Sequence, residues 1–143
     1  MSDSVYFLPL GGSDEIGMNL NLYGYGPEEK RKWVIVDCGV TFGDLSTPGV
    51  DLIMPDPTFI EERANDLVGM VLTHAHEDHM GAVAQLWKRL RCPIYATPFT
   101  AYLVRDRLAE HGLLDEVESL IQAAAASGGL SVPGFVRRAV STL

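Results

Sequence analysis

The 143-residue sequence has little of several features that mark particular protein classes. Its two cysteines, Cys38 and Cys92, are too few for a disulfide framework, so each is predicted to be a small buried hydrophobic residue. No apolar run approaches the roughly 18 residues that span a bilayer, and the start MSDSVYFLPLGG lacks the basic residues and long apolar core of a signal peptide. We therefore expect neither a disulfide-stabilised secreted protein nor a membrane protein, and the predicted location is the cytoplasm.

Positive charge is also scarce. The chain has 11 Lys and Arg residues against 19 Asp and Glu residues, and its formal net charge is −8. This balance opposes the phosphate backbone of nucleic acids at long range, so a nucleic-acid substrate requires metal ions or a basic surface from elsewhere. The remaining composition, 47% hydrophobic and 21% charged, is typical of one soluble globular domain with a real core.

Short β-rich segments precede amphipathic segments along the chain. Three β-rich segments come first, and the polar turn GPEEKR separates the last two, so we expect adjacent antiparallel strands at 5–10, 18–25 and 32–40. A loop with three prolines is predicted at 43–57. Strands are then expected at 67–73 and 93–97, and helices at about 58–65, 81–90 and 99–112. This order predicts sheets covered by helices.

The segment MVLTHAHEDHMGAV, residues 70–83, places ligand-type side chains at a junction between strand and helix. In an extended segment His74, His76 and Asp78 lie on one side of the chain, and His79 joins them only if the backbone turns at a helix start near Met80. Asp78 also suits a helix N-cap, and the plainer alternative is a group of polar loop residues. Four such side chains within six residues favour a metal site.

The spacing H-x-H-x-D-H suits two adjacent ions, with His74 and His76 on one ion and Asp78 and His79 on the other. It differs from the H-E-x-x-H zinc motif, whose histidines are four positions apart on one helical face. Imidazole and carboxylate ligands suit zinc, and manganese is the alternative. Two such ions can activate a shared water to attack a phosphorus or carbonyl centre, so the predicted reaction class is hydrolysis.

Four other candidates have simpler explanations. Glu77 points away from Asp78 in an extended segment and is expected to be solvated or in a salt bridge. His111 before Gly112 suits a helix C-terminus, where the helix dipole favours a histidine. The glycines of GGSDEIG, residues 11–17, lack the lysine and helix of a phosphate-binding loop and suit turns. Cys38 is expected to be buried at a strand end rather than to ligate metal.

The segment LTHAHEDHMGAV resembles the metal-binding motif of the metallo-β-lactamase fold. The blocks FLPLGGSDEIGMNLNLYGYG, WVIVDCGVTFGD, PGVDLIMPD and YATPFTAYLV are together similar to the N-terminal part of the ribonuclease J family of β-CASP nucleases, from about Val5 to Glu118. The resemblance implies the α/β class and the N-terminal part of a metallo-β-lactamase-like αββα sandwich. It also implies a metal-dependent RNA phosphodiester hydrolase with two zinc ions, or manganese, and RNA as partner. No DNA specificity is evident, and the family allows homo-oligomers.

The resemblance assigns roles to individual residues. It implies that His74, His76, Asp78 and His79 are metal ligands, with Asp78 also catalytic beside the attacking water. Asp37 in VDCG matches an acidic residue beside the site. There it would accept a hydrogen bond from the ring N–H of a ligand histidine and so fix the ring. The alternative for Asp37 is a turn residue before Gly39.

The family completes its site with later residues that this sequence does not show. After His79 the only histidine is His111, and from Ser119 the sequence departs from the family pattern. We predict a partial domain over residues 1–118 and a divergent, poorly ordered tail over 119–143, with a short helix, a break and a ragged end. The alternatives are another hydrolase of this fold, such as a glyoxalase II-like thioesterase, and a non-catalytic truncated fragment.

Overall fold

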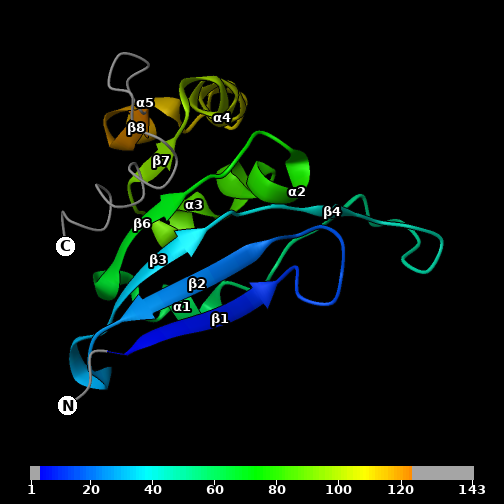
Figure 1. Ribbon diagram of the computed structural model, residues 1–143. Coiled ribbons are helices and arrows are strands. Elements are labelled where there is room, and N and C mark those ends of the chain that lie inside the picture. The colour runs from blue at the N-terminus through cyan, green and yellow to red at the C-terminus, as the bar shows by residue number, and fades with distance from the viewer. Residues whose placement is uncertain (1–3, 124–143) are drawn as a thin grey trace.

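A six-stranded mixed sheet organises the computed structural model, which describes residues 4–123 (Figure 1). The strand order is β1-β2-β3-β6-β7-β8. Their bounds are β1 Val5–Gly11, β2 Leu20–Tyr25, β3 Lys32–Val36, β6 Leu67–Val71, β7 Ile94–Ala96 and β8 Ile121–Ala123. A separate two-stranded sheet pairs β4 Thr41–Phe42 with β5 Leu52–Ile53.

The first half of the sheet is antiparallel and the second half is parallel. β1 pairs with β2 and β2 with β3 in antiparallel register, as predicted. Residues 12–19 reverse the chain between β1 and β2, and the short connection containing the 3-10 helix η1 (Glu28–Lys30) reverses it between β2 and β3. β3, β6, β7 and β8 pair in parallel. Parallel neighbours need a crossover connection, and helices of the chain form these crossovers. The α/β class is confirmed.

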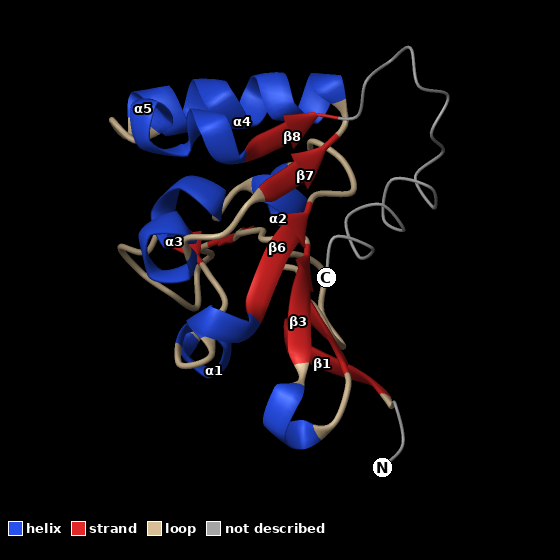
Figure 2. Cartoon of the chain, turned by 90° about the vertical axis from the view of Figure 1, so that its left-hand side faces the viewer, coloured by secondary structure: helices blue, strands red, loops and turns tan. Residues whose placement is uncertain are grey.

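The helices lie on one side of the sheet in Figure 2. They are α1 Thr58–Glu61, α2 Glu77–Met80, α3 Val83–Leu90, α4 Pro98–Glu110 and α5 Leu114–Val117, with 3-10 helices η2 Ala64–Asp66 and η3 Glu118–Leu120. α4 begins after Thr97, whose side-chain oxygen accepts a hydrogen bond from the Thr100 N–H, and Pro98 occupies its first position. Among residues 4–123 no helix is long and apolar enough to cross a membrane.

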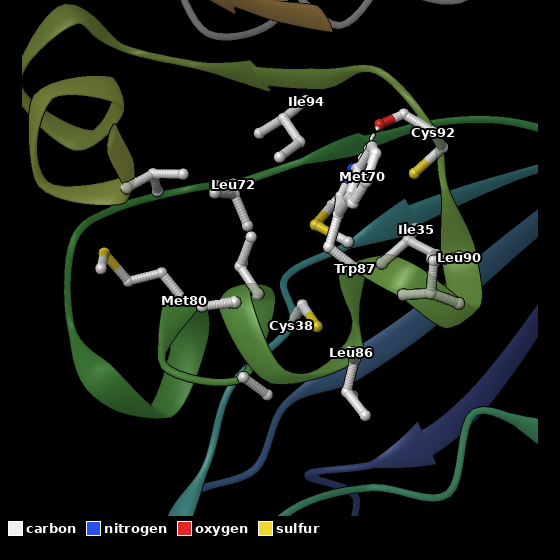
Figure 3. Packing of buried hydrophobic residues seen from close by; sticks show 14 of the residues in the cluster. Ile35, Cys38, Met70, Leu72, Met80, Leu86, Trp87, Leu90, Cys92 and Ile94 are labelled. Carbon is white, nitrogen blue, oxygen red and sulfur yellow. Dashed lines mark hydrogen bonds between the residues drawn. The ribbon is translucent and has the colours of Figure 1, made fainter. Parts of the chain in front are cut away.

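The core fills the space between these helices and the sheet (Figure 3). Ile35 and Met70 are fully buried on neighbouring strands, and Trp87 and Leu90 reach them from α3. The indole N–H of Trp87 donates to the carbonyl oxygen of Cys92 at 3.2 Å, which joins the helix to the start of β7. Burial of these apolar side chains supplies the main driving force for folding.

Both cysteines are buried and free, as predicted. Burial raises the pKa of the Cys92 thiol to about 12 and raises the pKa of Cys38 well above its usual range, because the interior disfavours a thiolate. Neighbouring Cys92 and Asp37 add smaller contributions at Cys38. Cys38 therefore behaves as a small hydrophobic residue, and its thiol is protonated at neutral pH.

Several predicted boundaries need correction. The helix expected at 58–65 is divided between α1 and η2, the helix expected at 81–90 starts at Val83, and the predicted loop 43–57 contains β5. Within the tail predicted from residue 119, residues 121–123 form β8, because Ile121 pairs with Ile94 and is buried. The short helix predicted for the alanine run, residues 123–126, is wrong at Ala123, and its other residues lie outside the described range. The proposed boundary at residue 118 stays a prediction, and the tail over 124–143 lies outside the described residues.

Candidate metal centre

The motif follows β6 at the end of the sheet where the parallel strands finish. β3 ends at Val36 and β6 ends at Val71, and these two residues are paired in the parallel register. Asp37 follows the first strand, and the motif His74–His79 follows the second. Residues that come directly after neighbouring parallel strands emerge at the same edge of the sheet. This topology brings together two sequence segments that are about 40 positions apart.

Asp37 is buried, with 4% of its surface exposed. Its backbone N–H donates to the Val71 carbonyl oxygen at 2.8 Å, and its Oδ1 accepts from the Thr73 N–H at 2.8 Å. Its Oδ2 lies 2.7 Å from Nδ1 of His79. A carboxylate accepts and does not donate, so Nδ1 of His79 carries a proton in this contact, and in the neutral imidazole the lone pair is then on Nε2.

Asp37 also has a turn conformation, with φ 68°. Aspartate tolerates the left-handed region better than most residues do. The turn expected before Gly39 is therefore present together with the carboxylate contact to His79. The two interpretations of Asp37 are compatible in this structure, and its role toward a metal ion stays a prediction.

The other predicted ligand side chains lie around the same point. The ring centroids of His74 and His79 are 4.0 Å apart, and those of His74 and His76 are 4.6 Å apart. Nε2 of His79 lies 3.3 Å from Oδ2 of Asp78. Nδ1 of His74 lies 2.9 Å from the hydroxyl oxygen of Thr73, which also contacts Asp37. The backbone thus gathers three imidazoles and one carboxylate on one surface.

The donor atoms lie close together but do not form the coordination shell of a metal ion. Within residues 4–123, no group of three or more His, Cys, Asp or Glu side chains has the arrangement that holds an ion. The donor types fit zinc, which accepts imidazole nitrogen and carboxylate oxygen.

The backbone turn within the motif starts earlier than predicted. α2 begins at Glu77 rather than near Met80, and its N-cap is His76 rather than Asp78. The N–H groups of His79 and Met80 both donate to the His76 carbonyl oxygen at 2.9 Å. Because the chain coils from Glu77 onward, His79 turns toward Asp37 although it directly follows Asp78 in the sequence.

The loop after β3 is packed directly against this turn. The N–H of Cys38 donates to the His79 carbonyl oxygen at 2.8 Å, and the N–H of Val40 donates to the Glu77 carbonyl oxygen at 3.0 Å. A Cβ atom at Gly39 would lie 1.8 Å from the carbonyl oxygen of Asp78. Sequence reasoning missed Gly39, although a glycine two residues after a strand-end aspartate is a signal for close backbone approach.

The structure agrees with the simpler explanations given for Glu77, His111 and the glycine turn. Glu77 forms an ion pair with Arg107 of α4. His111 is the C-cap of α4, and its Nδ1 lies 2.9 Å from the Arg107 carbonyl oxygen. Gly12 and Gly17 have positive φ angles in a turn between β1 and β2, and no helix follows them as in a phosphate-binding loop. These groups are therefore not ligands in this arrangement.

Comparison with known proteins finds relatives of this chain. Ribonuclease J of Sinorhizobium meliloti is 52% identical over 107 residues, which covers 75% of this chain and 19% of that protein. Ribonuclease J of Mycolicibacterium smegmatis is 38% identical, with 93% of this chain and 25% of that protein covered. The chain thus spans a quarter or less of the length of these two relatives.

A solved N-acyl homoserine lactone hydrolase aligns with 87% of this chain and 58% of its own chain, at 18% identity and a TM-score of 0.45. The family model described as the metallo-beta-lactamase superfamily matches residues 28–135, a range that includes Asp37 and the whole histidine motif. That match extends over most of the chain, so the protein belongs to the metallo-beta-lactamase superfamily.

Proposed function

We propose that this chain carries the metal-binding turn of a metal-dependent RNA phosphodiester hydrolase of the ribonuclease J type. Membership of the superfamily implies use of a divalent metal. The proposed ligands are His74, His76, Asp78 and His79, with two zinc ions as the metal and manganese as the alternative. The observation that carries the proposal is the 2.7 Å contact between buried Asp37 and Nδ1 of His79, which turns the other ring nitrogen, Nε2, toward the Asp78 carboxylate.

The two carboxylates at the site are suited to different tasks. Asp37 is buried, and its oxygens contact Thr73 and His79, so it is suited to orient the His79 ring. The Asp78 side chain is 36% exposed, and its Oδ2 lies near Nε2 of His79 on the accessible side. A bound divalent ion would supply Lewis-acid chemistry there. We assign Asp78 as a ligand that also accepts a proton from the attacking water.

RNA is the proposed substrate because the relatives are named ribonuclease J and their similarity extends well beyond the motif. A similarity of this length favours the nuclease over a glyoxalase II-like thioesterase that shares only the histidine cluster. The net charge of −8 opposes RNA binding by this chain alone. We therefore propose RNA cleavage for a longer protein of this type, located in the cytoplasm, with no preference for DNA and with homo-oligomers allowed.

Metal binding tests the ligand assignment. Calorimetric titration of the 143-residue chain with zinc is expected to show binding, and a His74→Ala, His76→Ala double variant is expected to lose it, because two of four donors are removed. His111→Ala is the matched control, since His111 lies at the end of α4 and contacts Arg107. Equal zinc affinity of the double variant and the wild type would refute the assignment.

An activity assay tests whether this chain is sufficient for catalysis. We predict negligible ribonuclease activity for the isolated 143 residues, because the four proposed ligands do not complete two ion sites and the chain provides no net positive charge to hold phosphates. The assay is cleavage of a labelled 5′-monophosphorylated RNA with zinc or manganese. Metal-dependent cleavage that Asp78→Ala abolishes would contradict this prediction and would show that the chain is a complete catalyst.

A further inference from the structure

Asn19 lies directly before β2 and contacts the metal-binding turn with both its backbone and its side chain. Its backbone N–H donates to the carbonyl oxygen of Asp78 at 3.0 Å, and its side-chain Nδ2 donates to the same oxygen at 2.9 Å. Its own carbonyl oxygen accepts from the N–H of Gly39 at 2.9 Å. Asn19 therefore links the turn to the loop that follows β3.

These contacts fix the orientation of the Asn19 amide. A carbonyl oxygen only accepts hydrogen bonds, so the side-chain atom that faces the Asp78 carbonyl is the amide nitrogen. The backbone leaves little room on the other side of the amide, because a Cβ atom at Gly12 would lie 2.3 Å from Oδ1 of Asn19. The amide is half-buried and is held between the glycine turn and the motif.

The same amide nitrogen lies 3.5 Å from Nε2 of His79. In the neutral ring with its proton on Nδ1, Nε2 is an acceptor, so the amide N–H can approach it in the metal-free protein and gives way when a metal ion takes that lone pair. The ring of His79 is thus held by the Asp37 carboxylate at Nδ1, and on its Nε2 side it faces both the Asn19 amide and Oδ2 of Asp78, which lies 3.3 Å from Nε2. The Asn19 contact is longer than the Asp37 contact, so the amide guides the ring more weakly than the Asp37 carboxylate does.

We infer that Asn19 is a positioning residue of the metal centre, which fixes the Asp78 backbone and the direction of the His79 ring. The inference rests on the proposed function, because it takes His79 and Asp78 to be ligands. Residues that orient the ligands of a metal typically change its affinity by about 10- to 100-fold when they are replaced. Asn19 acts through Asp78 and His79.

The experiment compares Asn19→Ala with Asn21→Ala by zinc titration. Asn21 is the matched control, because it is the same residue type two positions further along, in β2, where it pairs with Val36. We expect about 10-fold or greater weakening of zinc binding by Asn19→Ala, and wild-type affinity for Asn21→Ala. Asn19→Leu, which keeps a similar shape without the amide, is the second variant if Asn19→Ala does not fold. Thermal unfolding checks that each variant is folded.

A second measurement needs no metal. The ring nitrogen signals of His79 in metal-free, ¹⁵N-labelled protein are expected to change in the Asn19 variants and to stay unchanged in Asn21→Ala, whereas a merely structural role at the start of β2 would not alter them. Wild-type zinc affinity together with unchanged His79 signals in a folded Asn19 variant would overturn the inference. Failure of the wild-type chain to bind zinc would reject the proposed function instead, and the ring signals would still decide whether Asn19 holds His79.

Discussion

The two faces of the six-stranded sheet have different surroundings. On the face that the helices cover, Leu22, Ile35 and Met70 have no exposed surface. On the other face, Phe7 of β1 and Tyr23 of β2 are 56% and 44% exposed, and their ring centroids are 5.2 Å apart. Within residues 4–123 the helices close one face only (Figure 2).

The difference between the faces shows which contacts hold the described residues together. Burial of apolar surface between the sheet and the helices stabilises the fold, whereas apolar side chains on the open face contribute little to folding where water still reaches them. A large exposed apolar patch marks an interaction surface or an aggregation site. The αββα sandwich predicted from the sequence would place a second sheet on this face.

The largest effect is expected on the covered face. Ile35→Ala should lower the free energy of unfolding by about 2 to 5 kcal/mol, because it removes buried methyl groups and leaves a cavity beneath Trp87 and Leu90. Denaturant unfolding followed by circular dichroism measures the change. The neighbouring Val34 points to the open face, so Val34→Ala is the matched control and should cost clearly less. Equal losses would show that the two faces do not differ as described.

A smaller effect is expected on the open face. Phe7→Ala should lower the free energy of unfolding by no more than about 1 kcal/mol, because a half-exposed ring loses mainly its contact with Tyr23. The same change should raise solubility, since it shrinks an exposed apolar patch. Denaturant unfolding and the concentration at which the protein precipitates are the two measurements. A loss comparable to that of Ile35→Ala would mean that the open face is covered in solution.

The smallest effect is expected from the tail. Deleting residues 124–143 should move the thermal midpoint by no more than about 2 °C, because the segment begins with small residues and glycines and offers few large side chains next to β8. Deleting from Ser119 instead removes β8 and buried Ile121 and should lower the midpoint further. Thermal unfolding of both truncations is the test. A large drop on deleting 124–143 alone would show that the tail is a folded part of this domain.

The local features could be predicted from the amino-acid sequence. Alternating and β-branched residues in three early segments predicted the antiparallel strands, and the structure has them as β1, β2 and β3. The crowding of histidines and carboxylates after a buried strand identified His74, His76, Asp78 and His79 as candidates. Each of these features depends on residues within a few positions of one another, so the periodicity and spacing of side chains are sufficient to reveal it.

The tertiary structure alone decided which distant residues support the motif. Asn19 and Gly39 reach Asp78 across 59 and 39 positions of sequence, and the direction of the His79 ring depends on Asp37 at 42 positions away. The antiparallel pairing of β2 with β3 and the parallel pairing of β3 with β6 bring these segments together, and the loop after β3 donates hydrogen bonds to the carbonyl oxygens of Glu77 and His79 in α2. Sequence patterns report local conformation, whereas the pairing register and close backbone approach depend on how whole elements pack.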